Sequence, residues 1–275
     1  MSLEDRGPLR ALTAMVLAIA VLVGPDPVRA QTVLPLHIPT AEENVGRGDA
    51  LHRAQRPLQA LNAYQAAAAS DPAGGVAVEA LWKSAREAVN VGMLTQGGQE
   101  AELPWYRLAE GFARQAIATD ADSAPAHEWL AIALGRAALS EGPRTRVRMA
   151  GEVHAAALAA LAADSLSPGA HHVLGQWHAE VRRLHALERF LARRLMGADV
   201  FDEASWEEAE RHLLRATELA PTAVIHQVEL ARVFKDTGRD DLARTAAQRA
   251  LDLPSVEPVD PLYKEVARAL LAGLT

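Results

Sequence analysis

A spaced pattern of small residues and proline recurs along the chain and limits it to one kind of fold. In each copy an alanine is followed after four residues by Ala, Leu or Tyr, after three more by Ala, and after five more by Pro. The complete copies are Ala60-Tyr64-Ala67-Pro72, Ala156-Ala160-Ala163-Pro168 and Ala209-Leu213-Ala216-Pro221. Two looser copies are Ala109-Ala113-Ala116 with a late Pro125 and Ala243-Ala247-Ala250 with an early Pro254. Small residues at these steps form a smooth helix face against which another helix packs closely. The proline then ends one helix and opens the next at its first turn.

A second helix is predicted ahead of each copy, because apolar residues at helical spacing precede each one. Trp82, Trp129 and Trp177 lie on three of these first helices, and we expect them to pack in the core, with exposure of their edges in a groove as the alternative. Apolar residues make up 49 % of the chain but aromatic residues only 4 %, so alanine and leucine dominate and favour helix over strand. Predicted caps are Thr40 with Glu43, Ser205 with Glu208, Asp240, Ser167-Pro168 and Asp260-Pro261.

These helix pairs resemble the tetratricopeptide repeat, a helix–turn–helix unit of about 34 residues. The first anchors of the five copies lie 49, 47, 53 and 34 residues apart, so three units carry extra residues, at 87–104, 136–148 and 182–204. The predicted fold is all-α. It is a tetratricopeptide-like α-solenoid of about five helix pairs over residues 40–275, with extended helices and a C-terminal capping helix.

Five sequence blocks give a narrower resemblance. They are Leu81-Trp82-Lys83-Ser84-Ala85-Arg86, His127-Glu128-Trp129-Leu130-Ala131-Ile132, Leu174-Gly175-Gln176-Trp177, Leu184 through Phe190 to Met196-Gly197, and Ala204 to Pro221. Their order and spacing resemble the regulator of microtubule dynamics family over about residues 75 to 275. The resemblance implies a non-enzymatic, tetratricopeptide-like helical domain, whose eukaryotic members are linked to microtubules and organelle membranes.

The N-terminus has the order of a secretory signal peptide. Arg6 and Arg10 precede an apolar run from Ala11 to Val23, and Val28-Arg29-Ala30 supplies the small or aliphatic residues of a cleavage site before Gln31. A run of 13 residues is too short for a membrane span, which needs about 20 apolar residues. We expect a signal peptide at 1–30, an extended linker at 31–39 and an exported, periplasmic or secreted protein of bacterial type. Retention of the run as an uncleaved anchor is the alternative.

Composition and motifs exclude several chemistries. The chain has no cysteine, which removes disulfides, Cys-ligated zinc, iron–sulfur clusters and a thiol nucleophile. It also has neither a Gly-x-Ser-x-Gly elbow nor a phosphate-binding glycine loop, and its formal net charge of −7 disfavours nucleic acid as the main partner. We therefore expect no enzymatic activity and no cofactor.

Four histidines share one predicted helix: His171, His172, His178 and His185. A two-histidine helical metal site usually needs partners four residues apart, whereas these comparable steps are six and seven residues. The sequence prediction is therefore no metal site. A helical metalloprotein or hydrolase stays as the minor alternative.

One long amphipathic helix is predicted over 170–196. Its apolar stripe is expected to pack on neighbouring helices. Its opposite face carries Arg182, Arg183, Arg189, Arg193 and Arg194. A solvated basic face is the default interpretation, and binding of an anionic partner is the alternative.

Stacked helix pairs leave one curved surface lined by the first helix of each pair, and such surfaces bind peptides or helices. The polar residues expected to be exposed in this groove are Glu79, Lys83, Arg86, Glu128, Arg136, His172, Gln176, Arg232 and Lys235. Their mixed charge suits a protein or peptide partner better than a polyanion. The predicted function is a non-enzymatic scaffold or adaptor in the bacterial envelope. A membrane-surface or microtubule-associated adaptor, as the family resemblance implies, is the main alternative.

Overall fold

The chain folds into helices that follow one another as antiparallel pairs. The structure is a computed structural model and describes residues 38–72, 74–184 and 199–274. Within those ranges it contains eleven α-helices and one short 3₁₀ helix, and no strand. The predicted signal peptide at 1–30 and most of the linker lie outside the described residues. The helices belong to one unit that begins at Pro39. Among the described helices, none has the length and apolar character needed to cross a membrane.

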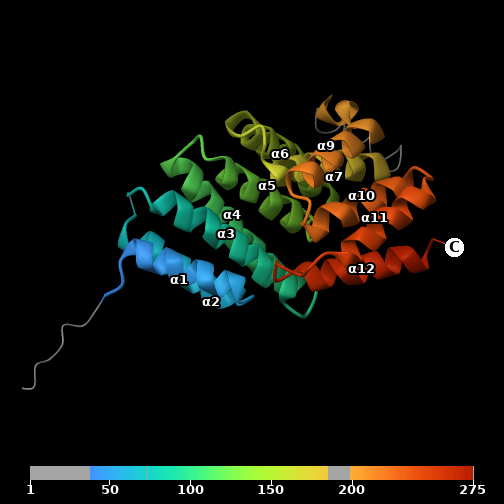
Figure 1. Ribbon diagram of the computed structural model, residues 1–275. Helices are drawn as coiled ribbons and strands as arrows, with labels where there is room; N and C mark the ends of the chain where they lie inside the picture. Colours follow the sequence, from blue (N-terminus) through green and yellow to red (C-terminus); the bar gives the residue numbers. More distant parts are fainter. Residues whose placement is uncertain (1–37, 73, 185–198, 275) are drawn as a thin grey trace, which may run out of the picture. The chain divides into compact units, whose positions relative to one another are not determined.

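Five helix pairs and a last helix make up this unit (Figure 1). The pairs are α1 (Ala41–Arg53) with α2 (Pro57–Ser70), α3 (Ala77–Leu94) with α4 (Gln99–Thr119), α5 (Ala124–Ala138) with α6 (Pro143–Ala163), α7 (Pro168–Arg183) with α9 (Trp206–Leu219), and α10 (Val224–Asp236) with α11 (Asp240–Asp252). The 3₁₀ helix η1 (Asp199–Glu203) precedes α9, and α12 (Asp260–Ala272) ends the unit. The prediction of an all-α solenoid with about five pairs and a capping helix is confirmed.

The repeated small residues lie where the helices meet. Of the fifteen anchor positions, all are buried except Ala163, which is exposed at the end of α6. The α7–α9 contact shows how closely the backbones approach. A Cβ added at Gly175 would lie 2.6 Å from Leu213 Cγ and 3.0 Å from the backbone oxygen of Ala209. Only small residues allow this separation, so the anchors set the spacing of each pair.

The helix ends agree with the sequence in part. Thr40 and Glu43 form both bonds of a capping box, and Ser167 Oγ accepts from the backbone N–H of Ala170. Pro168 opens α7 as predicted, but Pro72 and Pro221 lie in the turns ahead of α3 and α10 rather than in a first turn. Two of the three remaining predicted caps, Asp240 and Asp260, differ more.

Asp260 and Asp240 are not caps, because each is the first residue of its helix. The Asp260 carboxylate instead accepts from the backbone N–H groups of Val256 and Glu257, at 2.8 Å each. It therefore fixes the loop that leads into α12. Ser205 does cap α9, since its side chain accepts from the N–H of Glu208.

The predicted continuous helix over 170–196 is wrong. Helix α7 ends at Arg183, because the next residue, Leu184, has an extended backbone with ψ of 140°. Arg183 is held there by ion pairs to Glu180 at 2.5 Å and to Asp236 of α10 at 2.6 Å. The rest of the proposed basic face, including Arg189, Arg193 and Arg194, lies outside the described residues.

The first helices of successive pairs pack against one another, α3 on α5, α5 on α7 and α7 on α10. The predicted core role of the tryptophans is clearest for Trp177, which is buried and donates its ring N–H to the backbone oxygen of Ala150 at 2.8 Å. Trp82 and Trp129 are partly buried against the core. Helix α12 packs on α10 and α11 and ends the stack.

The anchor positions generate a matched stability test. Ala216 and Ala163 occupy the same position of the repeat, but Ala216 is fully buried and Ala163 is exposed. Ala216→Trp should overpack the interface and lower the free energy of unfolding by about 1–3 kcal/mol. Ala163→Trp should change it by less than about 0.5 kcal/mol. Urea denaturation followed by circular dichroism measures both, and equal losses would show that burial of the anchor face does not set stability.

Candidate functional site

The C-terminal segment of the chain runs across the surface formed by the first helices. We call the surface that α3, α5, α7 and α10 present toward α12 the inner face. At one end of this segment the Gln55 side chain donates to the backbone oxygen of Ser255 at 3.3 Å. At the other end the ammonium of Lys235, on α10, lies against Gly273. The segment from 255 to 273 therefore reaches from the turn after α1 to α10.

Tyr263 joins α12 to the middle of the inner face. Its hydroxyl accepts a hydrogen bond from the guanidinium of Arg136, on α5, and points to the sulfur of Met93, on α3, at 3.9 Å. Tyr263 is 8 % exposed, and burial raises the pKa of its hydroxyl, which therefore stays protonated. One aromatic side chain thus contacts two of the first helices.

A charged contact joins the loop before α12 to the first two helix pairs. His52 Nδ1 of α1 lies 2.8 Å from a carboxylate oxygen of Glu87, which is fully buried on α3. His52 Nε2 lies 3.5 Å from a carboxylate oxygen of Glu257. The carboxylates of Glu257 and Glu87 beside its ring raise the pKa of His52 to about 9. His52 is therefore protonated at neutral pH and lies between two carboxylates.

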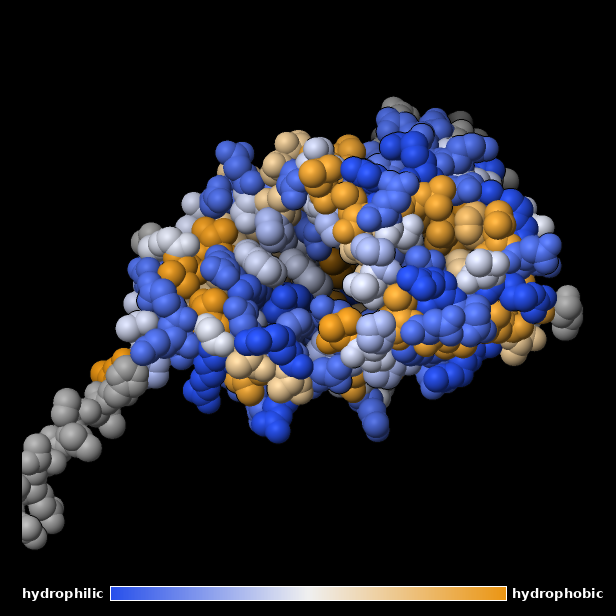
Figure 2. All heavy atoms as spheres, viewed as in Figure 1, coloured by the Kyte–Doolittle hydropathy of each residue, from blue (hydrophilic) through white to orange (hydrophobic). Residues whose placement is uncertain are grey.

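Part of the inner face stays open beside α12. A cavity of about 380 Å³ lies between α7, α10 and α12 and is lined by Glu180, Arg183, Arg232, Lys235, Asp236 and Leu270. Figure 2 shows that the face in view carries both hydrophilic and hydrophobic side chains and is hollowed near its centre. The lining combines both charges with one apolar side chain.

The charges of the open cavity are not all neutralised. Arg183 pairs with Asp236 and Glu180, and Arg232 pairs with Glu229 at 2.9 Å. Lys235 is exposed and has no ion pair within the part of the chain that the structure describes. The cavity therefore offers an ammonium group to a carboxylate brought by a ligand.

The groove residues predicted on α3 are mostly structural. Lys83 is wrong as an exposed groove residue, because it is 8 % exposed and pairs with Asp49 at 2.7 Å and Glu79 at 2.6 Å. Arg86 is half-buried, since its guanidinium donates to Glu87 and also lies over the ring of Trp82. Glu79 is exposed at the edge of this network.

The groove residues predicted on α5 and α7 are also held within the fold. Glu128 accepts from Ser167 Oγ at 2.7 Å, and burial raises the pKa of its carboxyl group. Arg136 is bound to Tyr263 and is half-buried, so the expectation that it is exposed is wrong. His172 is 4 % exposed, which contradicts the prediction, and Gln176 is half-buried on α7.

Of the nine predicted groove residues, only Arg232 and Lys235 of α10 line the open cavity. The sequence placed all nine on first helices correctly, but it gave no sign that α12 returns over α3 and α5. The cover that α12 provides explains why Arg136 is bound rather than free.

Histidines form a buried layer around α7. His172 and His226 face each other with their Nδ1 atoms 3.1 Å apart, and burial lowers the pKa of His226 to about 4. His171 and His212 also face each other, with their Nδ1 atoms 2.8 Å apart, and burial lowers the pKa of His212 to about 4. These rings stay neutral at physiological pH and keep lone pairs.

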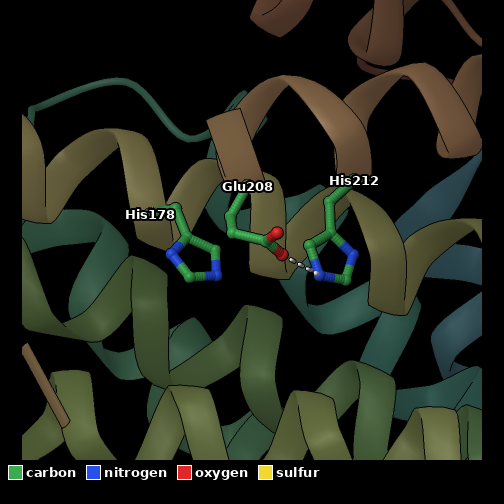
Figure 3. A group of neighbouring side chains, drawn as sticks. All are labelled: His178, Glu208 and His212. Atoms are coloured by element: carbon green, nitrogen blue, oxygen red, sulfur yellow. Dashed lines mark ion pairs between the residues drawn. The ribbon is translucent and has the colours of Figure 1, made fainter. Parts of the chain in front are cut away.

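One group in this layer has the composition of a metal site and was not predicted. His178 of α7 and Glu208 and His212 of α9 bring one nitrogen or oxygen atom each to within 4.8 Å of one another (Figure 3). This group draws on two helices, α7 and α9, whereas the four histidines considered in the sequence share one predicted helix. The spacing of four residues between Glu208 and His212 was the signal that could have found it.

Known proteins are similar to this chain in sequence and in fold. The sequence profile of regulator of microtubule dynamics proteins 1-3 matches residues 45–275. The chain belongs to this family. Regulator of microtubule dynamics protein 3 of Bos taurus is 27 % identical over 187 residues, which cover 67 % of this chain and 39 % of that protein. Regulator of microtubule dynamics protein 1 of the same species is 23 % identical over 198 residues, or 72 % of this chain and 62 % of that protein.

The chain thus matches less than two thirds of the length of these two relatives, and the family assignment concerns the helical unit. Among solved structures, a thermophilic tetratricopeptide protein of Thermus thermophilus is similar, with a TM-score of 0.57 and 18 % identity. The match covers 84 % of this chain and 99 % of that one. It establishes the tetratricopeptide-like fold.

The contact of His52 with Glu87 and Glu257 makes stability depend on pH. The folded-state pKa of His52, about 9, lies above its ordinary value of 6.5. The stabilisation is therefore complete below about pH 6.5 and is lost as pH rises through 9. We expect the melting temperature to fall between pH 6.5 and 9, and the fall to be smaller in His52→Gln. Thermal melts across this range measure it, and identical pH profiles for the two proteins would contradict the assignment.

Proposed function

We propose that this protein is a non-enzymatic adaptor that binds a helical or extended polypeptide on its inner face, beside α12. The observation that carries the proposal is α12 itself. A helix of this chain already lies on the inner face and inserts Tyr263 between Arg136 and Met93. A surface that holds one amphipathic helix has the shape and the apolar floor to hold a second segment next to it.

The open cavity sets the chemistry of that segment. Leu270 supplies apolar contact, and Lys235 supplies an ammonium group without an ion pair among the described residues. Arg232 lies beside it with its charge shared with Glu229. We infer that the partner presents an acidic side chain next to an apolar one. A long polyanion would meet the carboxylates of Glu180 and Asp236 in the same cavity and suffer repulsion.

We further propose that the protein acts in the bacterial envelope after removal of residues 1–30. The charged, apolar and small-residue order of that segment supports export. N-terminal sequencing of the native protein is the test, and a mature chain that begins at Gln31 is the expected result. An intact Met1 in the soluble fraction would contradict cleavage.

The name of the family supplies the alternative partner. The two bovine relatives are called regulators of microtubule dynamics. The net charge of −7 opposes binding to the acidic surface of a microtubule or of an anionic membrane. We therefore favour a polypeptide of the envelope and treat microtubule binding as the competing outcome.

Charge reversal tests the inner face directly. In the double variant Arg232→Glu and Lys235→Glu, capture of envelope proteins by the immobilised full chain should fall by more than about tenfold, because the cavity then repels an acidic segment. The matched control is Arg114→Glu with Arg148→Glu, two exposed arginines on the second helices α4 and α6. Quantitative mass spectrometry of the captured proteins measures the loss.

The control pair should leave capture unchanged, and both double variants should have circular dichroism spectra like that of the unmodified chain. Equal capture by the inner-face pair and the control pair would contradict docking in the cavity. The competing outcome is that the unmodified chain co-sediments with purified microtubules and that the inner-face double variant does so equally well. That result would favour microtubule binding over a polypeptide partner in the cavity.

A further inference from the structure

His178, Glu208 and His212 face one another across the contact between α7 and α9. The rings of the two histidines lie on either side of the Glu208 carboxylate (Figure 3). His212 Nε2 is 3.8 Å from a carboxylate oxygen of Glu208. Two imidazoles and one carboxylate are the protein ligands of many zinc sites that keep a fourth position for water. The helices themselves, packed through Ala209 and Leu213 against Gly175, hold this set in place.

Hydrogen bonds set the tautomer of His212. The backbone oxygen of Ser165 can only accept, so the His171 Nε2 atom that lies 3.2 Å from it carries a hydrogen. Neutral His171 then has a bare Nδ1, which accepts from His212 Nδ1 at 2.8 Å. The proton of His212 is therefore on Nδ1, and its Nε2, on the side of Glu208, carries the lone pair. A hydrogen-bond partner of this kind on the far nitrogen is typical of metal-binding histidines.

His178 is a buried ring with an unsatisfied nitrogen. The residue is 5 % exposed, and its Nδ1 has no hydrogen-bond partner. In Figure 3 the other ring nitrogen, Nε2, is the one that faces Glu208, and it is the atom of His178 that could bind an ion there. Burial lowers the pKa of the His178 ring below its usual value, so the ring is neutral at physiological pH and keeps a lone pair.

A cationic side chain occupies the position between two of the three groups. Nη2 of Arg211 donates to His212 Nε2 at 3.0 Å and also to the carboxylate of Glu208. The side chain of Arg211 is 58 % exposed, so it can move into solvent. Glu208, at 40 % exposed, can turn toward the histidines as Arg211 leaves. The arginine shows that the lone pairs of Glu208 and His212 converge on one cation.

We propose that His178, Glu208 and His212 bind one divalent transition-metal ion of the zinc class. The ion would displace Arg211, take one ligand from α7 and two from α9, and keep solvent-facing positions on the side of Glu208. Because it joins the two helices of one pair, it would stabilise the fourth pair of the solenoid. This site is separate from the cavity of the inner face and does not depend on the adaptor proposal.

The test is titration of the full chain, purified without a histidine tag, with Zn²⁺ alone, followed by calorimetry. We expect one ion per chain. Glu208→Gln should weaken binding by more than about tenfold. Loss of a residue that only supports a metal ligand already has an effect of about this size. Arg211→Ala should tighten binding, because it removes the competing cation and leaves all three ligands. Replacement of Zn²⁺ by Co²⁺ should give the visible absorption of a nitrogen- and oxygen-ligated ion.

Glu207→Gln is the matched control, since Glu207 is an exposed acid one residue before Glu208 and carries the same charge. It should bind Zn²⁺ like the unmodified chain. The proposal is overturned if neither the unmodified chain nor Arg211→Ala binds Zn²⁺, or if Glu208→Gln binds as tightly as Glu207→Gln. Melting curves of each variant, recorded without metal, separate a loss of ligand from a loss of fold.

Discussion

The close approach of paired helices is the constraint on which the rest of this structure depends. Where α7 meets α9, Gly175 leaves no room for even one added carbon beside Leu213. Alanine anchors are also buried in every other pair of helices. With so few aromatic residues in the chain, its core is built from many small contacts rather than a few large side chains. That geometry brings the first helices into one continuous row, and the row creates the inner face.

The inner face is not a vacant groove, because the chain's own C-terminal segment crosses it. Tyr263 binds to Arg136, and His52 lies between Glu87 and Glu257, so the first and last parts of the unit are tied together. What remains accessible is the cavity beside α12, bordered by Lys235. In the function proposed above, changes in this cavity could alter the partner while the helical scaffold is kept.

Local sequence signals predicted the helices and their pairing, because small-residue spacing and caps such as Thr40 act within one or two turns. The candidate site needed contacts between residues far apart in the chain. Arg136 and Tyr263 are 127 positions apart, so no periodicity reveals their contact. His178 and His212 belong to different helices, and only the packing of α7 on α9 brings them together. The break at Leu184 was also missed, since the apolar stripe continues past it in the sequence.

The central claim is that the C-terminal segment lies on the inner face and reaches α1. The absence of cysteine allows a direct measurement, because two introduced thiols would be the only ones in the molecule. Gln55→Cys and Ser255→Cys place them at the exposed contact between the turn after α1 and the loop before α12. A short bifunctional thiol reagent should form an intramolecular cross-link in the native double variant and lose it in urea, while either single variant forms none. A native double variant that cross-links no faster than the urea-unfolded chain would contradict the account.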